Sequence, residues 1–484
     1  MNGPSTLLAR LRVRRQSPGG QRSGRPAEQP TPGREFNRRL LAPMVLGSVL
    51  NPINSSMIAV ALVPVGTAFG APPAETAWLV TALYLATAVG QPVIGRLVDD
   101  YGPRRLYLAG TALVGLAGLL GALAPSLGLL VVARVLLGLG TSAAYPAAIH
   151  LTRSEAERTG QSSPTGVLTA LAVAGQTVAV VGPTLGGLLI GLGGWRTVFA
   201  VNVPLSLTCL ALGLSRLPAT LPRRNREDRL DHAGIALFAV LLLTLMLFVM
   251  KPGTALWHLP VLTVLAAVGF AVRETRTSDP FIDLRALARN RPLIATYLRQ
   301  VLGNTGTYAF LYGYTQWLEE GRGLGAASAG LVLLPLSLTG LAVSVVTGRS
   351  AAVRGKLLVG SVFQMAASAA LLLLGSTSAV AVLIAVGLLA GVPQGLIGLG
   401  NQTALYHQAD PATIASAAGL LRTFMYLGAM AASAANAAFF PHGATTGGLH
   451  HLALFMLGGA TLLFLAVLPD RSLGRMGAAV GIAS

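Results

Sequence analysis

The segment Gly95-Arg-Leu-Val-Asp-Asp-Tyr-Gly-Pro-Arg-Arg105 separates two long apolar runs and combines two glycines with acidic and basic side chains. A related pattern recurs at Gly348-Arg349 and Gly355-Lys356, with the same spacing between the two glycines. Glycine permits close approach of two backbones and dihedral angles that other residues avoid. Each copy stands between the second and third apolar runs of a group of six, so the sequence predicts two related helical bundles.

The composition indicates a membrane protein. Of the 484 residues, 53% are hydrophobic and only 11% are charged, whereas soluble domains carry about 25% charged residues. The formal net charge of +18 does not indicate nucleic-acid binding, because the arginines stand in short bursts between apolar stretches, as in cytoplasmic loops. The single cysteine, Cys209, excludes an internal disulfide.

Fourteen apolar runs approach the length of about 20 residues that crosses a bilayer. Basic residues gather in alternate loops, which places both termini in the cytoplasm and requires an even number of crossings. The loop at 401–411 is cytoplasmic by this count but lacks basic residues, so a miscount in the second half stays open. The runs are 42–64, 77–94, 106–125, 128–149, 165–190, 196–215, 233–250, 256–272, 293–316, 327–347, 357–375, 378–400, 412–436 and 449–468.

We therefore expect an all-α polytopic membrane protein with two six-helix bundles. The N-terminal bundle covers 41–217, a linker with two inserted central helices covers 218–275, and the C-terminal bundle covers 276–470. Residues 1–40 are rich in Arg, Pro, Gly and Ser and should form a disordered basic cytoplasmic tail. Residues 471–484 should form a second cytoplasmic tail, and no cleavable signal peptide is expected.

Several motifs occur in one order that resembles the major facilitator superfamily, and with fourteen spans its drug:proton antiporter group. The motifs are the loop 95–105, Arg134 with Gly138 and Gly140, and Gly182-Pro183 with Gly186-Gly187. The resemblance implies a secondary transporter in a bacterial cell membrane that exports amphipathic organic molecules by alternating access. It implies a monomer without a cofactor whose partners are a small-molecule substrate, membrane lipid and, where transport is proton-coupled, protons.

The loop motif is expected to act as a conformational latch, because a static turn needs no cluster of opposite charges. Its residues are Gly95, Asp99, Gly102, Arg104 and Arg105. The second copy has Ala352 and Val353 at the acidic positions, so a latch there should be weaker or absent. The fifth-helix motif combines a helix-bending proline with glycines that let a neighbouring helix approach, which predicts a seam formed by Gly182, Pro183, Gly186 and Gly187.

Proton coupling usually needs a carboxylate inside the membrane, yet none of the seventeen acidic residues falls in the middle of a predicted span. The resembled antiporters commonly carry an acid on the first helix, where this chain has Asn54. Three interpretations stay open. Coupling could use the loop acids Asp99 or Asp100, or it could use Glu319 or Glu320 at the outer end of the ninth span. The third interpretation is a uniporter or another driving force.

Polar side chains within the spans are the candidate substrate-cavity residues, since a polar group in lipid must find a partner or water. The first and ninth helices are counterparts in the two bundles and carry polar residues at helical spacing. Hydrogen bonds between helices are the equal alternative for any single residue, but the ninth-helix stripe favours a cavity. The candidates are Asn51, Asn54, Ser55, Gln91, Arg134, Tyr145, Gln176, Arg299, Gln300, Asn304, Tyr308, Tyr312, Gln394, Arg422 and Tyr426.

Amide, aromatic and arginine side chains suit a medium-sized amphipathic or anionic organic molecule. The seven histidines are scattered and form no catalytic or metal-ligand pattern, so we expect neither an enzyme nor a metal site. An uptake transporter and a membrane sensor or scaffold without transport remain alternatives.

Overall fold

The computed structural model describes residues 37–159, 165–218, 231–250, 256–277, 280, 282, 284–348, 350, 352–409, 414–470 and 472–473. The two predicted tails therefore lie outside the described residues, apart from 37–40 and 472–473. Within the described ranges the regular elements are helices and no strand occurs. The prediction of an all-α chain is confirmed for this part of the protein.

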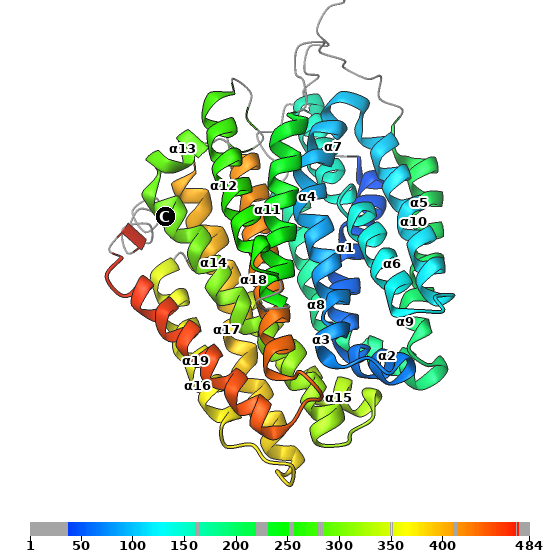
Figure 1. Cartoon of the computed structure of the whole chain (residues 1–484). Helices are drawn as coiled ribbons and strands as arrows, with labels where there is room; N and C mark the ends of the chain where they lie inside the picture. Colours follow the sequence, from blue (N-terminus) through cyan, green and yellow to red (C-terminus); the bar gives the residue numbers. More distant parts are fainter. Residues whose placement is uncertain are drawn as a thin grey trace, which may run out of the picture.

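The first half of the chain forms one group of helices, drawn in blue and cyan in Figure 1. Its short elements are η1 (Arg38–Leu40), η2 (Ile58–Val60), α2 (Leu62–Phe69), α3 (Pro73–Thr76) and α9 (Arg196–Ala200). Its long helices are α1 (Leu41–Met57), α4 (Trp78–Tyr101), α5 (Pro103–Ala122), α6 (Leu127–Thr141), α7 (Ala144–Thr159), α8 (Thr165–Gly193) and α10 (Asn202–Arg216).

The second half forms another group beside the first, preceded by the pair α11 (His232–Met250) and α12 (His258–Arg276). α11 contacts α4 of the first half and α18 of the second, so this pair lies along the seam between the two groups. The second group consists of α13 (Leu284–Arg289), α14 (Arg291–Ala309), η4 (Phe310–Tyr314), η5 (Trp317–Gly321), α15 (Ala326–Gly348), α16 (Val353–Leu371), α17 (Val380–Gln408), α18 (Ile414–Phe439) and α19 (Thr446–Val467).

The two groups repeat one packing pattern. α4 packs on α6, α5 on α6 and α5 on α10, just as α15 packs on α17, α16 on α17 and α16 on α19. In addition, α1 packs on α8 as α14 packs on α18. Between the groups, α4 packs on α18 and α15 packs on α8, which are again equivalent pairs. This reciprocity is what a duplicated bundle predicts.

Helix covers most of the described residues of each of the fourteen predicted runs. Ten helical segments in these residues are long and apolar enough to cross a membrane. The predicted runs that are not among these ten are 165–190, 293–316, 357–375 and 412–436. The number of fourteen crossings therefore stays a prediction.

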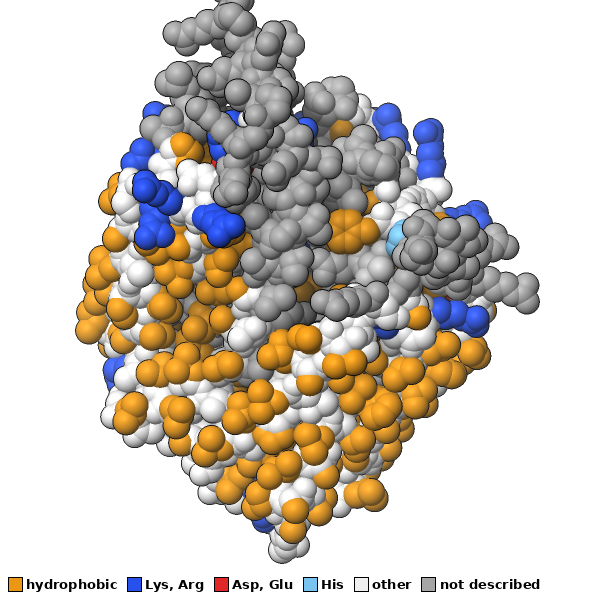
Figure 2. Space-filling view, turned by 180° about the vertical axis from the view of Figure 1, so that it is seen from behind, with side chains coloured by type: hydrophobic (Ala, Val, Ile, Leu, Met, Phe, Trp, Pro, Cys, Tyr) orange, Lys and Arg blue, Asp and Glu red, His pale blue; other side chains and the backbone are white. Residues whose placement is uncertain are grey.

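The outer surface is apolar around the bundle. Figure 2 shows hydrophobic side chains spread over one face, with most of the visible Lys and Arg side chains toward one end. Large apolar side chains are strongly exposed there and elsewhere, such as Val346 at 80% and Leu373 at 83%. A water-soluble surface rarely presents so many exposed aliphatic side chains together, whereas lipid solvates them without cost.

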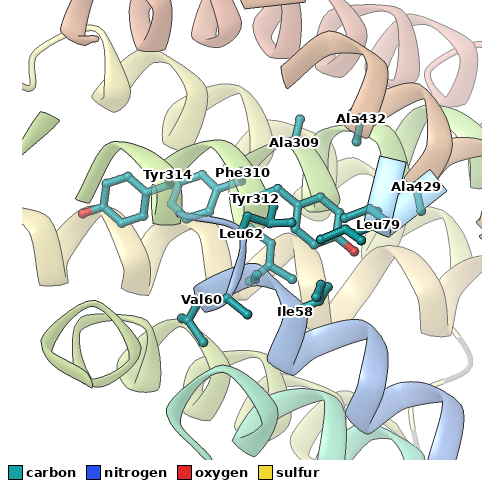
Figure 3. Packing of buried hydrophobic residues seen from close by; sticks show 14 of the residues in the cluster. Ile58, Val60, Leu62, Leu79, Ala309, Phe310, Tyr312, Tyr314, Ala429 and Ala432 are labelled. Carbon is teal, nitrogen blue, oxygen red and sulfur yellow. The ribbon is translucent and has the colours of Figure 1, made fainter. Parts of the chain in front are cut away.

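The largest buried cluster joins the two halves. Figure 3 shows Ile58 and Val60 of η2 and Leu79 of α4 close to Phe310 and Tyr312 of η4 in the second half. Ala429 and Ala432 of α18 belong to the same cluster. The interior of the protein is therefore continuous across the boundary between the two groups, and any relative movement of the halves must rearrange it.

Candidate functional site

Four tyrosines from both halves form a buried cluster near the middle of the molecule, which we name the tyrosine cluster. Tyr84 of α4 lies with its ring centroid 5.7 Å from that of Tyr308 and 5.5 Å from that of Tyr426 of α18. Its hydroxyl lies 3.2 Å from the hydroxyl of Tyr312, and the rings of Tyr308 and Tyr312 stack at 5.7 Å. Tyr84 and Tyr312 are each only 1% exposed.

The sequence explains how two of these tyrosines, Tyr308 and Tyr312, come to lie on one face. Asn304, Tyr308 and Tyr312 recur at intervals of four along α14 and η4, so they share one face. That face meets the other half through Tyr312, whose hydroxyl donates to the Ser55 carbonyl of α1 at 3.4 Å. The candidate set omits Tyr84, although this aromatic residue stands in the second apolar run and is the first-half member of the cluster.

Arg134 of α6 is a fully buried cation beside the tyrosine cluster. Its Nε donates to the Leu79 carbonyl at 2.7 Å and its Nη1 donates to the Asn54 carbonyl at 3.2 Å. Its Nη2 has no hydrogen-bond partner among the described residues. Tyr84 and Tyr312 are close enough to interact electrostatically with the guanidinium. The site thus holds a buried positive charge with one nitrogen left to bind a ligand.

The first-helix candidates mostly bond to neighbouring helices of their own half. The side-chain amides of Asn54 and Asn202 pair reciprocally, at 2.6 and 2.8 Å. Asn51 donates to the Thr141 hydroxyl at 3.0 Å, and the Ser55 hydroxyl donates to the Asn51 carbonyl at 2.9 Å. For Asn51 and Asn54 the structure shows the interhelical alternative, whereas Ser55 bonds within its own helix. A role in a cavity stays a prediction for these three candidates.

The candidate residues on the inner half of α14 are likewise bonded to neighbouring side chains. Arg299 is 1% exposed and forms an ion pair with Asp470 at 2.6 Å, just beyond the end of α19. Burial alone would raise the pKa of Asp470, but hydrogen bonds from Ser472 and Arg299 hold that pKa below its usual value. Gln300 accepts a hydrogen bond from Asn401 of α17 at 2.9 Å. The charge of Arg299 is thus directed to Asp470, a partner that the sequence analysis did not identify.

A second cross-half contact joins α7 and α18. The guanidinium of Arg422 lies 3.5 Å from the centre of the Tyr145 ring, which is cation–π geometry. Gln91 of α4 hydrogen-bonds Tyr426, so this contact is continuous with the tyrosine cluster. The structure therefore brings six of the candidates together with Tyr84: Gln91, Arg134, Tyr308, Tyr312, Arg422 and Tyr426, with Tyr145 beside them.

Three other candidates lie apart from this group or have a side chain outside the described residues. The Gln394 side chain of α17 packs beside Gly340 of α15, and its Oε1 has no partner among the described residues. The side chain of Gln176 lies outside the described residues. Asn304 donates to the Gln300 carbonyl at 2.8 Å, within its own helix.

The predicted seam residues allow very close packing. A β-carbon added at Gly182 would stand 1.7 Å from the Ser56 hydroxyl oxygen, and one added at Gly187 would stand 2.6 Å from the Ala326 carbonyl of α15. Thr184 donates to the Gly330 carbonyl of α15 at 3.0 Å. α8 thus packs against α1 of its own half and against α15 of the other half. Gly186 likewise packs against Met57, and Pro183 against Gly330.

The loop motif makes a bond within its own half. Gly102 adopts φ 87°, a backbone conformation that favours glycine. Arg104 donates to the Leu214 carbonyl at the end of α10 at 2.9 Å. In the second half, Arg354 donates to the Leu468 carbonyl after α19 at 2.7 Å, so both copies tie a third helix to the end of a sixth.

The rest of the predicted latch is less defined. The side chains of Asp99 and Asp100 lie outside the described residues, Gly95 is partly buried, and Arg105 is exposed. The latch therefore stays a prediction. The second copy does bond through Arg354, a residue at a different position of the motif.

One end of the molecule is closed by contacts between the halves. At the α3 end, the Ser433 hydroxyl of α18 donates to the Ala77 carbonyl at 2.9 Å and lies 3.2 Å from the Thr81 hydroxyl. The Thr184–Gly330 bond and the Tyr84–Tyr312 contact also join the halves. A molecule held between the halves would have to break these contacts to leave through the α3 end. In the described ranges, no group of three or more His, Cys, Asp or Glu residues is placed to hold a metal ion.

A family model described as the Major Facilitator Superfamily matches residues 44–433. The chain is 32% identical over 437 residues to the uncharacterized MFS-type transporter YwoD of Bacillus subtilis, covering 87% of this chain and 95% of that protein. It is 27% identical over 447 residues to the methylenomycin A resistance protein of Streptomyces coelicolor, covering 88% and 92%. It is 30% identical over 303 residues to the tetracenomycin C resistance and export protein of Streptomyces glaucescens, covering 61% and 55%.

Solved structures share the architecture. The peptide transporter POT superposes with a TM-score of 0.65 at 15% identity, covering 92% of this chain and 97% of that chain. The nucleoside transporter NupG superposes with a TM-score of 0.63 at 10% identity, covering 89% and 99%. At such identities the likeness shows the fold alone. The fold prediction, drawn from the loop and fifth-helix motifs, is confirmed.

Proposed function

This chain belongs to the Major Facilitator Superfamily and is a multi-pass membrane protein that transports small molecules, and from that premise we propose that it exports medium-sized amphipathic organic molecules by alternating access. The observation that carries the proposal is the tyrosine cluster beside Arg134. It draws side chains from both halves into one buried site, as a transporter that rocks one half against the other requires.

The chemistry of the site suits such a substrate. Tyrosine rings offer flat apolar faces for stacking and hydroxyl groups for hydrogen bonds. The Nη2 of Arg134 supplies a donor and a positive charge for a carbonyl or an anionic group. Among the described residues, the nearest groups to the cluster include no carboxylate, so a permanently cationic substrate is less suited to it.

Export rather than uptake is supported by two relatives whose names state resistance, one of which also states export. The fold does not decide the direction, since the similar solved structures include a nucleoside transporter and a peptide transporter. The substrates of those proteins are not assigned to this chain. Uptake, or uniport with another driving force, is the alternative that the transport assay below separates from export.

We place the protein in a bacterial cytoplasmic membrane, as a monomer with both termini inside. Exposed arginines support this orientation. They stand at the ends of helices that would reach the same membrane surface, and basic residues gather on the cytoplasmic side. These arginines are Arg38 and Arg39 before α1, Arg105 at the start of α5, Arg216 at the end of α10 and Arg276 at the end of α12.

Transport in proteoliposomes tests the proposal, with tetracenomycin C, methylenomycin A, ethidium and fluorescein as probes. We expect the protein to move at least one probe, and Tyr84→Ala to lower its apparent affinity about tenfold, since aromatic contacts contribute roughly 0.5–1.5 kcal/mol beyond their area. Tyr101→Ala is the matched control, because Tyr101 stands on the same helix but is 49% exposed. Absence of flux for every probe would favour a sensor or scaffold.

Direction is measured in cells that express the protein. An exporter lowers the steady-state cellular content of the transported probe relative to cells that carry the Tyr84→Ala variant. A higher content in the cells with the unmodified protein would establish uptake and overturn the proposed direction.

A further inference from the structure

Four acidic residues are buried in the part of the chain that the structure describes, and three of them have a clear partner. Asp231 and Glu155 form ion pairs with arginines. Glu274 accepts a hydrogen bond from a backbone amide at 2.7 Å. The fourth is Glu319, which is 7% exposed and whose Oε1 has no hydrogen-bond partner among the described residues.

Glu319 and Glu320 stand side by side in sequence but differ in exposure. Glu319 stands in η5, where the preceding residues Trp317 and Leu318 are both fully buried. Its neighbour Glu320 is exposed and accepts a hydrogen bond from the Ala444 amide of the loop before α19. Two adjacent glutamates thus have opposite environments: one is solvated and bonded, and the other is buried with an unsatisfied oxygen.

No described cation neutralises Glu319. Arg322, the nearest arginine in sequence, donates instead to the Ser376 and Ser378 carbonyls. His450, near the start of α19, bonds the Leu374 carbonyl at 2.9 Å. The charged or titratable groups on the elements packed around η5 are Glu320, Arg322, Tyr312, Tyr314, His442, His450 and His451.

Glu319 lies beyond residue 316, the last residue of the predicted ninth span. Burial, reinforced by the neighbouring charge of Glu320, raises the pKa of the Glu319 carboxyl to about 9. A carboxylate without a partner in a buried site takes up a proton rather than remain charged. In this conformation Glu319 therefore carries its proton at neutral pH.

The helix that carries Glu319 departs from regular α-helical geometry. After α14 the backbone passes through two π-helical segments, η4 and η5, and such segments are frequent at functional sites. η4 carries Tyr312, which bonds to Tyr84 of the other half, and it also contacts η2 of the first half. A change of charge at Glu319 would act on the same continuous helical segment that joins the two halves.

We propose that Glu319 is the proton-binding residue that couples transport to a proton gradient. The inference rests on the proposed function and selects one of the three open interpretations. In the alternate conformation, opened to water at the α3 end, the Glu319 carboxylate takes up a proton from the outer water. In the conformation described, closed at that end, the new O–H bond is intact and the acid is buried. The O–H bond then breaks and the proton passes to water that enters from the opposite end, so one proton moves inward for each substrate molecule exported.

The test compares Glu319→Gln with its neighbour Glu320→Gln in proteoliposomes. Glutamine matches the shape of the protonated acid and cannot release a proton, so Glu319→Gln should fold and bind the transported probe. With the vesicle interior one pH unit more acidic than outside, one-for-one exchange supports about tenfold accumulation of the probe. We expect this accumulation for the unmodified protein and for Glu320→Gln, and none for Glu319→Gln.

Exchange of labelled for unlabelled probe without a pH gradient is the control readout. We expect Glu319→Gln to keep this exchange, which separates lost coupling from lost folding or binding. If Glu319→Gln still accumulates the probe about tenfold, or if the unmodified protein ignores the gradient, the inference is wrong while the transport proposal stands. If the unmodified protein moves no probe at all, the proposed function itself fails.

Proton release on substrate binding gives an independent measurement for purified protein in weakly buffered detergent solution. Glu319→Gln should lack the proton signal that the unmodified protein and Glu320→Gln share. Equal signals from all three proteins would overturn the assignment.

Discussion

At the scale of single residues, Arg134 sets the chemistry of the site. Its guanidinium is held by two backbone carbonyls from α1 and α4, and no described carboxylate neutralises it. Burying a cation costs free energy unless the cation is hydrogen-bonded. Buried cations inside membrane proteins usually belong to functional sites. Arg134 thus combines a structural role, tying two helices, with a ligand-binding one through Nη2.

Arg134→Lys should separate these two roles. Lysine keeps the positive charge but cannot fork between two carbonyls, so binding of fluorescein should weaken about tenfold, since a hydrogen bond to a charged group contributes about 1.5–3 kcal/mol. Binding of an uncharged probe should change much less. Fluorescence titration of the purified protein measures both, with Arg105→Lys as the exposed control. Equal weakening for both kinds of probe would remove Arg134 from the binding site.

The sequence could identify polar positions but could not pair them. Spacing of four placed Tyr308 and Tyr312 on one face, yet nothing along the chain indicates that Tyr84 is their partner, because that contact depends on the packing of distant helices. The same holds for Asn54 with Asn202 and for Arg299 with its acid beyond α19. Periodicity defines a face, while the neighbour of that face is a property of the tertiary structure.

At the scale of the elements, α8 makes a close contact between the halves. Its glycines bring its backbone against α15, where any side chain on Gly187 would meet the Ala326 carbonyl. The motif of glycine and proline indicated a packing seam from sequence alone. It could not indicate that one glycine faces the first helix while another faces the opposite half.

Gly187→Ala should therefore weaken the closed α3 end. Overpacking of a tight contact typically costs about 1–3 kcal/mol, and here the cost falls only on the conformation in which α8 meets α15. Cysteine cross-linking across the α3 end should become slower by about fivefold or more, as that free energy implies. Gly191→Ala is the control on the same helix, because its added carbon would lie 3.6 Å from Ala327. Unchanged cross-linking would show that the seam is not tight.

The inserted pair α11–α12 is fastened at one end by charge. Asp231 accepts hydrogen bonds from Arg273 at 3.0 Å and from the Gly234 amide at 2.9 Å. Burial alone would raise the pKa of Asp231, but these bonds hold it below its usual value. The apolar runs at 233–250 and 256–272 predicted the two helices. The ion pair between them could not be predicted, because it depends on how the helices pack.

The pH dependence of stability follows from the depressed pKa of Asp231. A carboxyl whose pKa is lower when folded stabilises the folded protein above its unfolded pKa of about 3.9 and loses this effect as pH falls through the folded value. Thermal unfolding in detergent should thus show Asp231→Asn less stable than the unmodified protein at pH 7, with the difference shrinking at pH 3. A difference that grows on acidification would contradict the assignment.

At the scale of the whole molecule, equivalent helices pair in equivalent ways in the two halves, and the tyrosine cluster stands where the halves meet. The repeated glycine spacing at 95–102 and 348–355 was enough to predict this duplication. It left open which end is closed, because that depends on small differences between two conformations of one sequence. The α3 end is closed here by Ser433, Thr184 and their partners.

Distance measurements between spin labels on the two halves test alternating access most directly. Labels at Thr67 and Ser328 report the α3 end, and labels at Ser154 and His407 report the α7 end; all four positions are exposed. The native Cys209 is fully buried and should not react. On adding a transported probe or changing the pH, one distance should lengthen while the other shortens. If both distances stay fixed, or both change in the same direction, the halves do not rock about the tyrosine cluster.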